Sequence, residues 1–152
     1  MAVSTDHPSD RKLDDRLREA AAALPALRAR WRLVQAPEAD GADLPASALN
    51  EFDRLHTEAA ELLEAITSEC ATACSDARAA GRDCPVPDGL ARAIHHADLW
   101  LGADFRWHGL YRRAARRGAI TPRRARDLER AFGELVGRVH DVLAAYVASM
   151  PR

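Results

Sequence analysis

Hydrophobic residues recur every three or four positions through most of this chain, which is the repeat of amphipathic α-helices. The repeat predicts four long helices, over residues 9–35, 47–80, 88–118 and 122–150. Short connections between long helices place neighbours antiparallel, so the pattern predicts an all-α, up-down-up-down four-helix bundle. The apolar positions of the first helix are Leu13, Leu17, Ala20, Leu24, Leu27, Trp31 and Val34.

Residue types typical of helix ends support these boundaries. Thr121 followed by Pro122 is a capping residue followed by proline in the first turn. Gly81 is a natural terminator, and Asp88 can cap the third helix. Pro25 lies inside the first helix, where a proline removes one backbone hydrogen bond. The alternative fold is therefore one in which Pro25 splits this helix, leaving a three-helix core with a loosely attached arm.

Length and composition fit one folded unit. The 152 residues fit a single domain, which we expect to span residues 9–152 after a disordered leader at residues 1–8. The net charge is −1, so no global excess of charge points to nucleic acid or a membrane surface. No apolar run approaches the ~18 residues needed to span a bilayer. Three cysteines and no signal peptide predict reduced thiols in the cytoplasm.

Two polar residues, Asp104 and His108, fall near the middle of the apolar face of the third predicted helix. A charged and an ionisable group in a core must be paired, hydrated or bound to a ligand. Antiparallel packing places His108 within about one helical turn of the level of His56 on the second helix. One hypothesis is a metal or small-ligand site made by His56, Asp104 and His108. The simpler hypothesis is a buried Asp–His pair that satisfies itself and fixes the helix register.

Cys70 and Cys74 lie one turn apart on the predicted buried face of the second helix, at the level of His96. With Cys84 from the connecting loop, these side chains could form a tetrahedral zinc site or a copper(I) site. The simpler interpretation is that Cys70 and Cys74 pack as small apolar residues and that Cys84 is an exposed thiol. The sequence identifies neither a metal nor a cofactor.

Nine arginines crowd residues 106–130, where there are only two acids, around the turn between the third and fourth helices. Such a cluster is typical of contact with phosphate or nucleic acid. Residues 38–69, at the same end of the bundle, carry nine acids and one base. We therefore expect much of the basic charge to be neutralised within the molecule or across a dimer, and no helix-turn-helix spacing supports nucleic acid as the partner. The candidate partner or anion surface comprises Arg112, Arg113, Arg116, Arg117, Arg123 and Arg124.

No motif of a known catalytic chemistry occurs in the chain. It has no glycine-rich phosphate loop, no nucleophile elbow and no zinc-protease signature, so we assign no catalytic residue and do not expect an enzyme. The sequence favours a cytoplasmic, non-enzymatic interaction or regulatory protein that binds a protein partner or itself. The alternative is a bundle that binds a metal or a small ligand through its core His and Asp residues or its cysteines.

Overall fold

The computed structural model describes residues 8–34, 46–101, 113–114 and 116–150. Their long elements are the helices α1 (Pro8–Val34), α2 (Ala46–Ala79), α3 (Asp88–Leu101) and α5 (Pro122–Ala148). This part of the chain contains no strand, so the prediction of an all-α four-helix bundle is confirmed. None of these described helices is long and apolar enough to cross a membrane.

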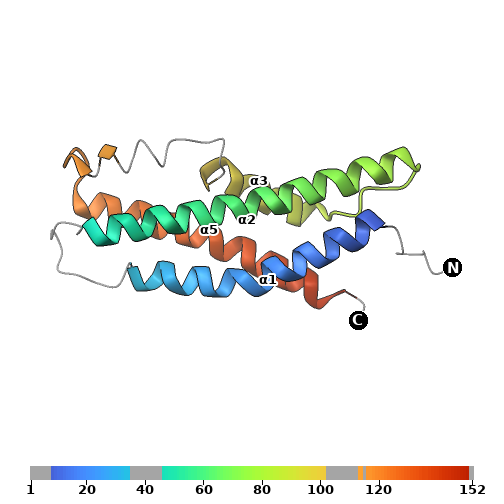
Figure 1. Cartoon of the computed structure of the whole chain (residues 1–152), viewed down its shortest axis with the longest axis horizontal. Helices are drawn as coiled ribbons and strands as arrows, with labels where there is room; N and C mark the ends of the chain where they lie inside the picture. The colour runs from blue at the N-terminus through green and yellow to red at the C-terminus, as the bar shows by residue number, and fades with distance from the viewer. Residues whose placement is uncertain (1–7, 35–45, 102–112, 115, 151–152) are drawn as a thin grey trace.

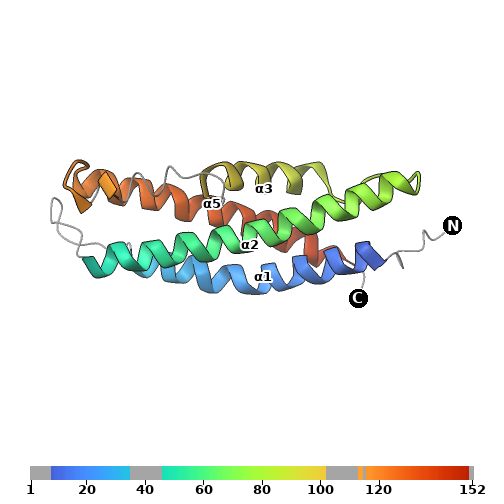
Figure 2. The same ribbon diagram turned by 45° about the horizontal axis from the view of Figure 1, so that its top comes forward.

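The helices alternate in direction along the chain, so that α1 begins and α5 ends at the same end of the bundle (Figures 1 and 2). Ion pairs between α1 and α2 agree with antiparallel packing. Arg82, just beyond α2, lies 3.0 Å from Asp10 near the start of α1. Arg30, near the end of α1, lies 2.9 Å from Glu51 near the start of α2. Both α2 and α5 pack against α1 and α3, which places α2 and α5 diagonally across the bundle.

Capping interactions explain where α5 begins and where α2 ends. The Thr121 hydroxyl accepts a hydrogen bond from the Arg124 amide (3.2 Å), which caps the start of α5 as predicted. Gly81 has a φ of 71°, in the left-handed region that glycine adopts without steric cost. The Arg82 amide then donates to the Ala77 carbonyl over 2.7 Å, which closes α2.

Pro25 lies inside α1, which is continuous from Pro8 to Val34. The alternative in which Pro25 splits this helix is therefore wrong. Leu24 and Leu27, on either side of the proline, are only 3% and 6% exposed. Their burial against the other helices stabilises the helical path more than one missing hydrogen bond destabilises it.

The helix predicted over residues 88–118 is confirmed for its first fourteen residues, which form α3. Residues 113, 114 and 116 are also helical, and Gly118 ends this turn with a φ of 72°. Residues 102–112, which include Asp104 and His108, lie outside the described residues. Residues 1–7 of the predicted leader lie outside them as well, whereas Pro8 already belongs to α1.

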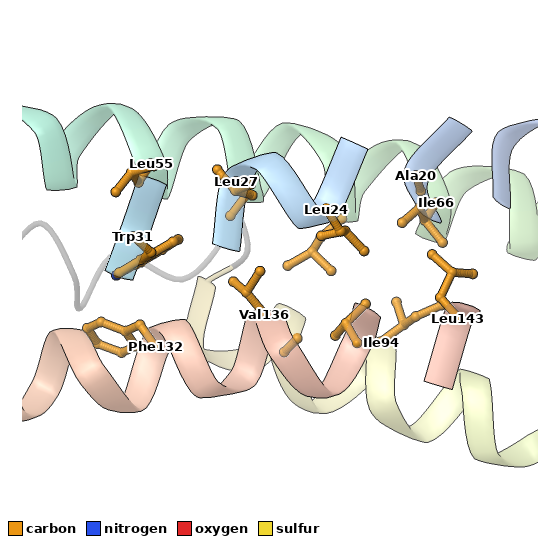
Figure 3. Close-up of a cluster of buried hydrophobic side chains, with 14 of the residues drawn as sticks. Ala20, Leu24, Leu27, Trp31, Leu55, Ile66, Ile94, Phe132, Val136 and Leu143 are labelled. Atoms are coloured by element: carbon orange, nitrogen blue, oxygen red, sulfur yellow. The ribbon is translucent and has the colours of Figure 1, made fainter. Parts of the chain in front are cut away.

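The core is built from aliphatic side chains of all four helices, with few aromatic rings (Figure 3). Alanines such as Ala20, Ala59 and Ala97 are no more than 2% exposed, which lets the helices approach closely. Each buried leucine or isoleucine contributes about 1.5–3 kcal/mol relative to an exposed one. The predicted apolar face of α1 is confirmed from Leu13 to Trp31, and Val34 packs at its margin.

Candidate functional site

Trp31, His56 and Glu129 form a hydrogen-bonded group inside the bundle, which we call the polar layer. His56 Nε2 lies 3.0 Å from Oε1 and 3.2 Å from Oε2 of Glu129. The Trp31 indole Nε1–H donates to Oε2 of the same carboxylate over 3.1 Å. All three side chains are 0% exposed. The polar layer therefore joins α1, α2 and α5 through one carboxylate.

Aromatic rings enclose His56 on two sides. Its ring centroid lies 5.2 Å from that of Trp31 and 5.0 Å from that of Phe132, with the Phe132 ring nearly perpendicular to it. A carboxylate in such surroundings needs hydrogen-bond donors, and Trp31 and His56 provide them. Neither His56 nor Glu129 reaches the surface, so their hydrogen bonds are made within the protein.

The structure gives His56 a partner that was not expected from the sequence, Glu129. Asp104 and His108, the predicted neighbours, lie outside the described residues, and the structure pairs His56 with Glu129. Sequence analysis missed Glu129 because it was counted as one more charge in the arginine-rich segment. Its spacing held the signal, since Glu129 lies four residues after buried Ala125 and three before buried Phe132.

Cys74 and Cys84 form a disulfide, so the prediction of three reduced thiols with an exposed Cys84 is wrong. The turn at Gly81 folds the chain back over the end of α2 and brings the two Cα atoms to 4.4 Å. Two of the three cysteines are thereby paired, which removes the free-thiol argument for a reducing compartment. A disulfide sulfur is also no thiolate ligand for a metal.

Cys70 keeps its free thiol on the wall of a groove of about 460 Å³ between α2 and α3. Burial, with a smaller contribution from the charge of Glu69, raises the pKa of the Cys70 thiol to about 11. The histidine that lines this groove is His95, whereas the predicted His96 is exposed outside it. In the described parts of the chain, no three His, Cys, Asp or Glu side chains are arranged to hold a metal ion.

The arginine surface is partly neutralised within the molecule, as expected. Arg116 donates hydrogen bonds to Asn50 (2.9 Å) and to Asp53 (3.0 Å) near the start of α2. Arg112 lies outside the described residues. The other predicted members are exposed: Arg113, Arg117, Arg123 and Arg124.

An arginine of α1 forms ion pairs with two glutamates of α2, which the sequence did not indicate. Arg30 pairs with both Glu51 and Glu58, and Arg54 also binds Glu51. The hydrogen bond from Arg30, followed by the one from Arg54, lowers the pKa of Glu51 below its usual value. Sequence analysis missed Arg30 because its role depends on how α1 is rotated toward α2.

A second groove, of about 530 Å³, runs along the outer side of the bundle between α1 and α2, and we call it the α1/α2 groove. Leu27 and Leu62 lie along it together with small side chains, among them Ala23 and Ala26. Its two edges differ in charge. The residues at these edges are Arg16 and Arg30 on α1 and Glu58 and Glu61 on α2.

Comparison of the chain with protein-family models, with curated proteins and with solved structures finds no match.

Proposed function

We propose that this chain is a non-enzymatic interaction protein that associates with a second copy of itself through the α1/α2 groove. The observation that carries the proposal is the opposite charge of the two helices that border this groove. Arginines line it from α1 and glutamates line it from α2. A surface with this division is complementary to itself.

The charge pattern selects one arrangement of the two copies. A twofold axis parallel to the helices places α1 of one copy against α2 of the other, as a closed symmetric dimer requires. Arg30 already pairs with Glu58 within its own copy. The rotation keeps each residue at its level along the bundle, so Arg30 of each copy also comes near Glu61 of its partner, one helical turn from Glu58. Rotation about an axis across the helices would instead bring α1 against α1 and oppose like charges, which disfavours that arrangement.

The residues between these edges suit close contact with another helix. Ala23 and Ala26 are exposed, and Ala65 is half-buried beside them. Small side chains allow two helices to approach closely. The groove extends from Arg16 to Arg30 on α1, about 21 Å at the rise of an α-helix. This footprint is at the low end of specific interfaces, so we expect a dissociation constant of roughly 1–100 µM.

The complete burial of the polar layer also supports a role without catalysis. His56 and Glu129 are the described residues closest to an acid–base pair in geometry, and both are 0% exposed. Their hydrogen bonds hold helices together rather than meeting a substrate. The α1/α2 groove, by contrast, is open along its length and lined by side chains that a partner can contact.

Sedimentation velocity of the full chain over about 1–200 µM tests this proposal. We expect a monomer–dimer equilibrium that Ala26→Glu and Glu61→Arg each shift by at least about tenfold toward monomer. Ala145→Glu, at an exposed position of α5, is the matched control and should leave the equilibrium unchanged. A monomer throughout this range, or equal weakening by all three substitutions, would overturn the proposal.

A further inference from the structure

We propose that a polar pocket between α1 and α5 binds a small oxyanion, with a phosphate group as its preferred chemistry. The pocket has a volume of about 210 Å³, and we call it the arginine pocket. Three guanidinium groups and one carboxylate surround it. Its lining residues are Arg28, Trp31, Arg32, Arg130, Gly133 and Glu134.

Arg28 is held in place along α5. Its guanidinium carbon and Nε lie 3.0 Å from the point where a Cβ on Gly137 would stand, so the side chain lies directly over this glycine. Its Nη1 lies 3.5 Å from Oδ1 of Asp141, which is a long contact. The Arg28 guanidinium is thus positioned by packing while most of its hydrogen-bond donors remain available.

Arg32 and Arg130 supply donors from the two helices that face each other across the pocket. Among the residues that the structure describes, Arg32 has no ion-pair partner. Arg130 lies 3.7 Å from Asp127, and their side chains are 66% and 56% exposed, so this pair is weak. Both guanidinium groups can therefore turn toward a ligand at small cost.

The two arginines of α1 are one helical turn apart. Like charges at this spacing on one face of a helix repel each other. An anion between Arg28 and Arg32 would replace this repulsion with two attractive contacts. The electrostatic energy of the two arginines is therefore lower with a bound anion than without one.

The chemistry of these groups specifies the class of ligand. Guanidinium groups donate pairs of hydrogen bonds that match the oxygens of phosphate and similar oxyanions. A volume of about 210 Å³ is below the usual size of pockets for drug-sized ligands, so the site suits a phosphate group rather than a whole nucleotide. Glu134 opposes a negative ligand and should limit its affinity.

This site is separate from the arginine surface that the sequence indicated. Arg130 belongs to the arginine-rich segment 106–130, but none of the pocket's arginines belongs to the candidate surface between residues 112 and 124. Two of them come from α1, which lies far from that segment in sequence. Their convergence on Arg130 depends on the antiparallel packing of α1 against α5, which brings Arg28 beside Asp141.

Calorimetric titration of the full chain at constant ionic strength, set with potassium chloride, tests the proposal. For inorganic phosphate we expect a dissociation constant of roughly 0.1–1 mM, as suits a ligand of five heavy atoms. Arg32→Gln should weaken binding about tenfold, since it removes one charged donor. Glu134→Gln should strengthen binding several-fold, and Arg123→Gln, at an exposed position outside the pocket, should leave the affinity unchanged.

A parallel titration with phenyl phosphate distinguishes the two sources of such a group. Tighter binding of inorganic phosphate would identify the free ion as the ligand, and tighter binding of phenyl phosphate would identify a phosphate ester. Both results support the site. Absence of phosphate binding at 10 mM in the native chain, checked by circular dichroism to be folded, would overturn the proposal. Equal effects of Arg32→Gln and Arg123→Gln would also overturn it.

Discussion

His56 and Glu129 connect two helices that lie diagonally across the bundle, with His56 Nε2 at 3.0 Å from Oε1 of Glu129. The helices that carry them, α2 and α5, each pack against α1 and α3 and are not neighbours. Trp31 of α1 completes the connection by donating to the same carboxylate. One carboxylate thus ties three of the four helices together at a single level.

Glu129→Ala should destabilise the fold by about 2–5 kcal/mol. It removes the acceptor of both the Trp31 indole and the His56 ring in a place that water does not reach. Urea denaturation followed by circular dichroism measures the change in the free energy of unfolding. Asp127→Ala, an exposed acid of the same helix, is the control and should change it by less than about 0.5 kcal/mol. Equal small effects would show that Glu129 is solvated.

Replacing both members of the pair should cost less than the two single replacements combined. His56→Leu with Glu129→Leu removes both ionisable groups, and apolar side chains of similar size often substitute well for buried ion pairs. The Trp31 indole N–H loses its acceptor in the double variant as it does in the single Glu129 variant, so this loss is counted only once. A double-mutant cycle on the free energy of unfolding gives the interaction energy directly. Strict additivity of the two single changes would mean that the side chains do not interact.

Pro25→Ala should stabilise the protein by about 1–3 kcal/mol. The substitution restores a backbone donor inside α1, which is already helical on both sides of position 25. Thermal and urea unfolding of the native chain and the variant measure the gain. Ala22→Gly, at an exposed position in the same helix, is a control that should destabilise by about 1 kcal/mol. Loss of stability in Pro25→Ala would show that the proline contributes a bend that the packing requires.

Reduction of the Cys74–Cys84 disulfide should lower the free energy of unfolding by about 2–3 kcal/mol, the value for a closed loop of about ten residues. The comparison is between native chain unfolded with and without a reducing agent. Cys84→Ser should be insensitive to reductant, whereas Cys70→Ser should respond as the native chain does. If Cys70→Ser were insensitive to reductant instead, Cys70 would be part of the disulfide and the Cys74–Cys84 pairing would be wrong.

Cys70 should react slowly with iodoacetamide at neutral pH and faster as the pH approaches 11. Burial raises the pKa of this thiol to about 11, so the reactive thiolate is rare at pH 7. A raised pKa also means that Cys70 contributes stability below its usual pKa of about 9, and that this contribution is lost as the pH rises toward 11. Mass spectrometry of alkylated protein gives the rate, with urea-unfolded chain as reference. A rate midpoint near 9 in the folded chain would contradict the burial of Cys70.

Local sequence signals predicted α1, α2, α5 and the start of α3 to within two residues. The apolar repeat of α1, the cap at Thr121 and the terminator at Gly81 act within a few residues, so they can be recognised without knowing the fold. The same local signals overestimated the effect of Pro25 on the continuity of α1. The helix is stabilised by the burial of Leu24 and Leu27, which depends on the other helices.

The contacts of the candidate sites could not be predicted in this way. The carboxylate that His56 meets depends on the rotation of α5, and Glu129 has no local feature that separates it from exposed acids nearby. The Cys74–Cys84 pairing depends on the path of the chain after Gly81. Arg28 and Arg130 likewise lie near each other because α1 packs against α5. The order of the helices in the sequence does not determine which helices pack together.

Gly137 gives the arginine pocket a thermodynamic connection to the fold itself. The Arg28 guanidinium rests on this glycine, and a methyl group there would come within 3.0 Å of it, so Gly137→Ala would displace the arginine. A ligand that engages Arg28 would in turn favour the conformation in which α1 is seated on α5. The melting temperature of the bundle would then rise with ligand concentration, and a substitution at residue 137 chosen for helix propensity alone would alter ligand affinity as well.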